Sequence, residues 1–145
     1  MKLLVDADGC PVVDLCICEA RARGLEALLF CDTAHILNRE GARTIVVEKG
    51  ADSVDFALVN QVQRGDVVVT QDYGLAAMCL SRGAIPVRQD GLVYDADNID
   101  SLLLARHTAK KIRRGGGRLK GPKKRTGADD AAFLASLRKV LDQRL

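Results

Sequence analysis

Short apolar runs alternate with helix-length segments along most of this chain, and this alternation constrains its fold more than any other feature. The runs are short, apolar and bounded by glycine or polar residues, which is typical of strands buried on both faces. Strands are predicted at 3–5, 25–30, 44–47, 67–70 and 84–87. Strands separated by helices build a mainly parallel sheet with helices on both sides. The sequence therefore predicts an α/β protein with a three-layer α/β/α architecture.

Helices are predicted between these strands and after the last one, at 11–24, 53–63, 74–82, 98–111 and 129–144. Pro11 suits a first helical turn, and Gly24 stands where a helix would end. Residues 92–94 follow the turn signal Asp90-Gly91 and are expected to form a small hairpin partner. A chain of 145 residues fits one compact domain, so we predict a single domain over 1–145.

Carboxylates follow several of these strands directly. Asp6 and Asp8 follow the first strand, Asp72 follows the fourth, and Asp55 lies in the first turn of the helix after the third. A helix that leaves a parallel strand begins at the carboxyl end of that strand, so these side chains share one edge of the sheet. Several carboxylates in one crevice repel one another unless a cation neutralises them. We therefore predict Asp6, Asp8, Asp55 and Asp72 as metal-binding and catalytic residues.

The predicted ion is Mg²⁺ or Mn²⁺, because these are oxygen ligands without His or Cys. Capping of a helix is the alternative for single residues, and Asp52 is expected to be a cap rather than a ligand.

The five cysteines lack the paired spacing of zinc sites and are expected to be packed thiols, although Cys10, at a helix start, would have a lowered pKa. His35 stands in no ligand or triad spacing and is predicted to be a surface or partly packed histidine.

The net charge of +3 conceals a division of the chain. Residues 1–105 hold nine Lys/Arg against sixteen Asp/Glu, whereas residues 106–145 hold thirteen against three. Much of the excess lies in a basic, glycine-rich segment that we predict as a loop over 110–127. Such a run suits phosphate contacts without base specificity, and a solvated loop is the alternative. The predicted nucleic-acid-binding residues are Lys110, Lys111, Arg113, Arg114, Arg118, Lys120, Lys123, Lys124 and Arg125.

Several short motifs follow one another in a fixed order along the chain: Asp6-Ala-Asp-Gly-Cys-Pro11, Gly50-Ala-Asp-Ser-Val-Asp55, Gly65-Asp-Val-Val-Val-Thr-Gln-Asp-Tyr-Gly-Leu-Ala76, Asn98-Ile99 and Gly121-Pro122 ahead of Asp130 and Phe133. This ordered set resembles the YaiI/YqxD family of small bacterial proteins. Gly74 departs from the pattern, since many relatives have proline there. The family is grouped with PIN-like domains, which implies adjacent first and fourth strands. The resemblance also implies Mg²⁺- or Mn²⁺-dependent RNA cleavage by Asp6, Asp55 and Asp72, with Asp8 assisting.

Three functions remain open from the sequence. The first is a metal-dependent nuclease or phosphodiesterase acting on RNA or another polyanion. The second is a phosphatase of the haloacid-dehalogenase type, because Asp-x-Asp-Gly after a first strand also fits an aspartyl nucleophile. The third is a nucleic-acid or protein binding module without turnover. The chain has no apolar run of membrane-spanning length and no signal peptide pattern, so we expect a cytoplasmic protein with no membrane partner.

Overall fold

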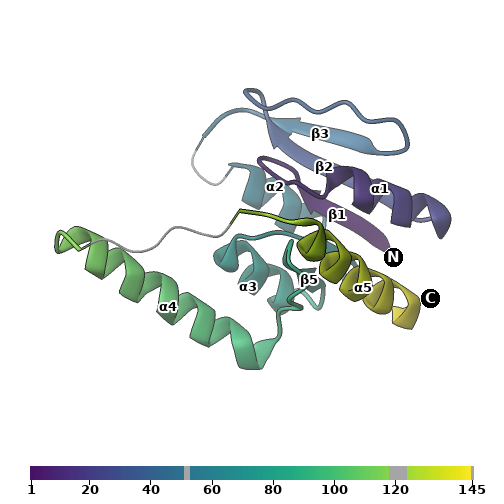
Figure 1. The fold of residues 1–145 in the computed structure, drawn as a ribbon. Coiled ribbons are helices and arrows are strands. Elements are labelled where there is room, and N and C mark those ends of the chain that lie inside the picture. Colours follow the sequence, from purple (N-terminus) through teal and green to yellow (C-terminus); the bar gives the residue numbers. More distant parts are fainter. Residues whose placement is uncertain (51–52, 118–123, 145) are drawn as a thin grey trace.

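The computed structural model of the chain has five parallel strands covered by helices on both faces (Figure 1). It describes residues 1–50, 53–117 and 124–144. The strands are β1 (Lys2–Asp6), β2 (Glu26–Asp32), β3 (Arg43–Val47), β4 (Val67–Val69) and β5 (Ile85–Val87). The helices are α1 (Val13–Ala22), α2 (Ser53–Gln61), α3 (Tyr73–Ser81), α4 (Ala96–Arg114) and α5 (Gly127–Arg144). The predicted α/β/α class is confirmed.

The strands are ordered β3-β2-β1-β4-β5 in the sheet. The chain builds outward from β1 through β2 and β3, then crosses back to place β4 on the other side of β1, with Leu4 opposite Val68. The neighbouring first and fourth strands expected from the resemblance are therefore confirmed. The order reverses between β1 and β4, and in such sheets the crevice beyond the carboxyl ends at this point is where ligands bind.

Each face of the sheet has its own apolar layer. Leu3 and Val5 of β1 pack in one layer with apolar residues of α1 and α5, whereas Leu4 packs in the other with α2 and α3. This division follows from the alternation of side chains along a strand. Through these two layers the sheet packs against four helices, and this packing fixes the ends of the strands in position.

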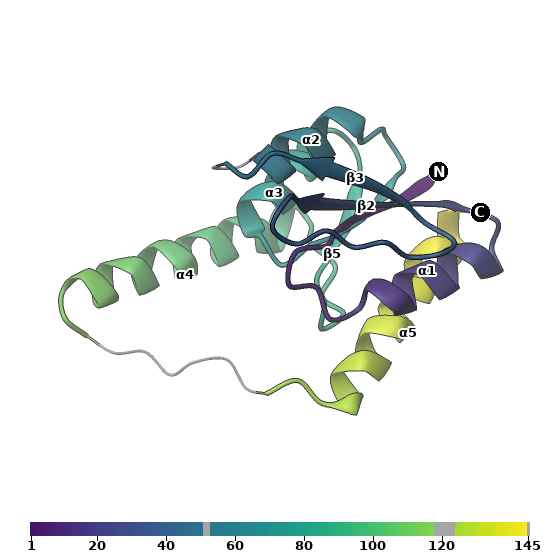
Figure 2. The ribbon, with the colours of Figure 1, turned by 90° about the horizontal axis from the view of Figure 1, so that it is seen from above.

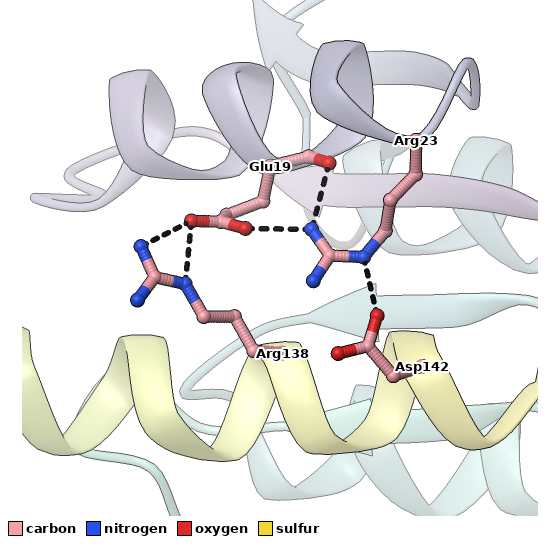
Figure 3. Close-up of polar contacts among 4 residues, drawn as sticks. All are labelled: Glu19, Arg23, Arg138 and Asp142. Carbon is pink, nitrogen blue, oxygen red and sulfur yellow. Dashed lines mark hydrogen bonds and ion pairs between the residues drawn. The ribbon is translucent and has the colours of Figure 1, made fainter.

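A polar network joins α1 to α5 on the first face (Figure 3). Glu19 accepts hydrogen bonds from Arg23 Nη1 at 2.6 Å and from Arg138 Nε at 2.8 Å, and Arg23 Nε donates to Asp142 Oδ1 at 2.8 Å. Burial by itself would raise the pKa of Glu19, but the two arginines outweigh it and hold that pKa below its ordinary value. The network therefore fixes α5, the last helix of the chain, onto α1.

Helix α4 begins with a capping box, in which Asp95 and Asn98 each accept from the other's backbone N–H. Its first turns pack through Ile99 on Ala76 and Tyr94, and the rest of the helix leads away from the sheet (Figure 2). It ends at Arg114, three residues beyond the predicted end, because helix breakers appear only at the glycines that follow. Residues 110–114 of the predicted basic loop are therefore helical, and residues 118–123 lie outside the described part of the chain.

The remaining predictions on the fold concern a hairpin and membrane spans. Val87 and Val93 form an antiparallel bridge, which confirms the expected pairing of residues 92–94 with the last strand. Among the described residues, no helix has the length and apolarity needed to cross a membrane.

Candidate active site at the carboxyl edge of the sheet

A cleft of about 860 Å³ lies at the switch point of the sheet, beyond the ends of β1 and β4. All four predicted site residues line it, although they come from three separate parts of the chain. They are Asp6, Asp8, Asp55 and Asp72. The topology therefore gathers side chains that the sequence separates by up to 66 positions.

Thr70, at the end of β4, connects two of these aspartates. Its hydroxyl donates a hydrogen bond to Asp6 Oδ2 at 2.8 Å and accepts one from the backbone N–H of Asp72 at 3.0 Å. Thr70 is fully buried, and Tyr94 donates from its own hydroxyl to the Thr70 carbonyl at 3.2 Å. Because β1 and β4 are neighbours, this one side chain fixes both Asp6 and the turn that carries Asp72.

The environment of Asp6 disfavours its charged form. The pKa of Asp6 is raised to about 6, mainly by burial; the hydrogen bond from Thr70 opposes this shift, and the charges of Asp72 and Asp8 add to it. Repulsion among acidic groups is therefore one of the causes. A bound cation would reverse this balance, because positive charge near the cleft favours the ionised carboxylate.

Asp8 also belongs to a second group of potential metal ligands. Asp8, Asp32 and His35 each offer one ligand atom, and these atoms lie within 4.8 Å of one another. His35 Nδ1 is 2.8 Å from Asp32 Oδ1, and the backbone N–H of Asp32 donates to Asp8 Oδ2 at 3.4 Å. Burial and the charge of Asp32 raise the pKa of Asp8. His35 is exposed, as predicted for a surface histidine, but the turn after β2 also brings it beside Asp8 and Asp32, which the sequence did not indicate.

Asp72 combines two roles that the sequence presented as alternatives. Its Oδ1 caps α3 by accepting from the backbone N–H groups of Gly74 at 2.9 Å and Leu75 at 3.2 Å, and the residue also lines the cleft. Asp55 lies in the first turn of α2, where its charge adds to burial in raising the pKa of the Cys79 thiol to about 12. Asp52, the predicted cap, lies outside the described residues.

Two arginines of α4 face the acids across the cleft. Arg106 and Arg113 line it, and Arg106 Nη1 lies 3.6 Å from Asp72 Oδ1. The two are seven residues apart, two helical turns, so both lie on the same face of α4, about 10 Å apart along its axis. The strands run toward the side on which α4 projects in Figure 1, so this helix forms one wall of the cleft.

The predicted nucleic-acid-binding residues do not lie together on one surface. Only Arg113 lines the acidic cleft among those that are described. Lys110, Lys111 and Arg114 are exposed on the last turns of α4, and Lys124 is exposed before α5. Arg125 pairs with Asp130 at 2.8 Å and lines an adjacent cavity of about 420 Å³. The other three, Arg118, Lys120 and Lys123, lie outside the described residues.

Sequence reasoning missed four residues of the site: Thr70, Asp32, His35 and Arg106. Asp32 could have been found by the argument used for Asp6, since it also ends a buried strand. His35 then follows three residues later. Nothing local in the sequence marks Thr70 or Arg106, because their partners are contributed by β1 and α3 through the tertiary fold.

Cys10 is not an activated thiol. Burial raises its pKa to about 11, and the charge of Asp6 adds to this effect. The lowered pKa expected from a helix start is therefore wrong, since α1 begins only at Val13 and the thiol is three residues ahead of it. Cys10 packs against the apolar layer of α1 and α5.

The chemistry of the cleft fits a divalent cation. Asp8 Oδ1 is buried and has no hydrogen-bond donor among the described residues, and His35 Nδ1, at 3.9 Å, is too far away to supply one. A buried carboxylate oxygen without a donor is costly unless a cation contacts it. Asp6 and Asp72 supply further oxygens in the same cleft. Carboxylate oxygens are the ligands that Mg²⁺ and Mn²⁺ prefer.

The fold and the cleft together define a small parallel α/β protein with an acidic site at the switch point of its sheet. The family model described as "Uncharacterized BCR, YaiI/YqxD family" matches residues 4–143, and the chain belongs to this family. The resemblance seen in the motifs is thereby confirmed.

Curated relatives match over nearly the whole chain. A UPF0178 protein of Exiguobacterium sibiricum is 54% identical over 144 residues, which cover 99% of each chain. A UPF0178 protein of Clostridium acetobutylicum is 50% identical over 143 residues, 97% of each chain. One from Ruminiclostridium cellulolyticum is 50% identical over 137 residues, 94% of this chain and 90% of the relative. No solved structure matches the chain.

Proposed function

We propose that this protein is a divalent-metal-dependent nuclease or phosphodiesterase that acts on RNA. One observation carries the proposal: the carboxylates of Asp6, Asp8, Asp55 and Asp72 line a single cleft that is walled by the arginines of α4. Acids that gather in one place suit a cation, and arginines beside them suit phosphates. The resemblance to PIN-like domains supports the same function.

Asp6, Asp8 and Asp72 are the residues that would hold the ion, with Asp55 next to them. When bound, Mg²⁺ or Mn²⁺ polarises a phosphoryl oxygen and lowers the pKa of a water molecule. Thr70 orients the Asp6 carboxylate through its hydroxyl, and the cap on α3 fixes Asp72. Arg106 and Arg113 are placed to contact phosphates of a strand that lies along α4, which orients the substrate without reading its bases.

The proposal is tested with a labelled single-stranded RNA incubated with Mn²⁺, Mg²⁺ or a chelator. We expect metal-dependent cleavage by the native chain and its loss in Asp6→Asn and Asp72→Asn. Asp14→Asn is the matched control, because Asp14 is an exposed carboxylate of α1 paired only at the surface with Arg39. Cleavage that persists in both site variants would contradict the proposal.

Calorimetric titration with Mn²⁺ separates a site from a contaminating activity. Binding should be lost in Asp6→Asn and retained in Asp14→Asn. The His35→Ala variant then reports whether the Asp8, Asp32 and His35 group takes part, since a weakened heat of binding would place an ion there. If RNA binds in a salt-dependent manner but is not cleaved with any metal, the protein is a binding module instead.

A further inference from the structure

The face of α4 that points away from the cleft carries an exposed apolar stripe. We define the outer stripe as the residues that line a shallow groove of about 430 Å³ on this helix: Ser101, Leu104, Ala105, Thr108, Ala109 and Ile112. Leu104 is 65% exposed and Ile112 is 41% exposed. Large exposed aliphatic side chains that line up along a helix mark a surface that another protein covers.

The body of the protein does not cover this stripe. Helix α4, which the structure describes throughout, has one buried residue, Ile99, and it lies on the opposite face. Arg106 and Arg113 share the face of Ile99, at helical spacings of seven residues. A partner on the outer stripe would therefore leave the acidic cleft open.

Charged residues beside the stripe indicate what the partner is. Asp100 precedes the centre of the helix and Lys111 follows it; both are exposed, and their spacing of eleven residues, about three turns, places them on one flank of the stripe. The two are equally distant from the point between Ala105 and Arg106. Asp97 and Arg114 are centred on the same point, with Asp97 within the stripe and Arg114 farther round the helix. When a second copy of the helix runs in the opposite direction, the acidic end of this flank therefore faces the basic end of the same flank on the other copy.

Two copies of α4 packed antiparallel satisfy this pattern. In antiparallel helix pairs, the same flank of both helices meets, so the acidic half of one helix faces the basic half of the other. On its other side the stripe is bordered by Asn98 and Leu102, which carry no charge, so no like charges meet there. The small residues of the stripe allow the helices to approach closely. In a parallel pair, this flank would instead face the opposite flank of the second helix, and Asp100 and Lys111 would have no charged partners there.

We propose that the outer stripe of α4 is a self-association surface, on which a second copy of this chain packs its own α4 antiparallel around a twofold axis. The contact would also support the free half of the helix, which carries Arg113 and leads away from the body in Figure 2. This proposal does not depend on the proposed function, because it concerns the opposite face of the helix.

The test measures the mass of the full-length chain by light scattering and sedimentation over a range of concentrations. We expect a dimer that dissociates on dilution, and a monomer for Leu104→Glu. The matched control is Phe56→Glu, which changes a side chain that is 59% exposed on α2 and should leave the dimer intact. Circular dichroism confirms that each variant is folded.

Charge reversal tests the antiparallel register. Asp100→Lys and Lys111→Asp should each weaken the dimer by at least about tenfold in Kd, since each creates two repulsive pairs. The double variant should restore it, and an equimolar mixture of the two single variants should form a heterodimer. A native chain that stays monomeric at every concentration, or a dimer that survives Leu104→Glu, would overturn the proposal, as would a failure of both the double variant and the mixture to restore it.

Discussion

The Thr70 hydroxyl donates a hydrogen bond of 2.8 Å to Asp6 Oδ2 and thereby joins the ends of β4 and β1. The residues are 64 positions apart, and the bond forms because the two strands are neighbours in the sheet. This hydrogen bond favours the charged form of Asp6, which burial disfavours. Thr70 is thus a positioning residue for the site.

Thr70→Val is expected to move metal binding to higher pH. Without the hydroxyl, the pKa of Asp6 rises above its value of about 6, so more alkaline conditions are needed to ionise the ligand. The lost hydrogen bonds also cost roughly 1–2 kcal/mol of stability. Calorimetric titrations with Mn²⁺ across a pH series measure the shift. Thr70→Ser keeps the hydroxyl and should retain the native profile, so an equal shift in both variants would contradict this role.

Asp6→Asn is expected to stabilise the metal-free fold at neutral pH. The folded-state pKa of Asp6 is raised from 3.8 to about 6, so the native state binds the extra proton and loses stability as pH rises through that window. Removing the charge should recover roughly 1–3 kcal/mol at about pH 7. Below the ordinary pKa, Asp6 is protonated in both states and the gain should vanish. Urea unfolding at both pH values, with a chelator present, measures this; a gain that does not depend on pH would be the contrary result.

Asp6 also shows how much of the site could be predicted from the sequence. A buried strand followed by Asp-x-Asp places two carboxylates at the end of β1, and the same argument places Asp72 after β4. These are local statements, because a strand end and the next helix start are read from adjacent residues. The parallel topology then brings the residues to one edge, and the cleft contains all of them.

Arg106 and His35 show why the rest could not be predicted. Arg106 contacts Asp72 only because α4 packs on α3 and then projects past the carboxyl edge of the sheet, and the direction of a helix after a loop is set by tertiary packing. The turn after β2, where the Asp32 side chain accepts from the backbone N–H of Ala34, brings His35 Nδ1 to 3.9 Å from Asp8 Oδ1. Neither placement leaves a periodic pattern in the sequence.

Substitutions of Asp72 should separate its cap from its role in the cleft. Asp72→Ala removes the side chain that accepts from Gly74 and Leu75, and should cost about 1 kcal/mol of stability. Asp72→Ser retains an acceptor for the cap and should stay close to the native stability. Both variants should lose Mn²⁺ affinity to a similar degree. If Asp72→Ser bound Mn²⁺ as the native chain does, Asp72 would be a cap only.

Glu19→Gln is expected to lower stability without affecting the site. The change leaves Arg23 and Arg138 facing a neutral amide in the network of Figure 3, and we expect a loss of roughly 1–3 kcal/mol. Because the pKa of Glu19 is lowered by its partners, this contribution is present above the ordinary pKa and fades as pH falls. Thermal unfolding measures the loss. Mn²⁺ titration of the folded variant should match the native chain, and altered binding would show that the two faces of the sheet are coupled.

Arg113→Gln should reduce the salt dependence of RNA binding. If Arg113 neutralises one phosphate, its loss lowers the slope of log K against log salt by about 1 and weakens binding to all sequences alike. Fluorescence anisotropy with single-stranded RNA in the Asp6→Asn background measures affinity without cleavage. Arg114→Gln is the matched control, since the adjacent arginine carries the same charge but does not line the cleft. Equal changes in slope for the two variants would mean that α4 attracts RNA as a diffuse basic surface and that the cleft does not select where the strand lies.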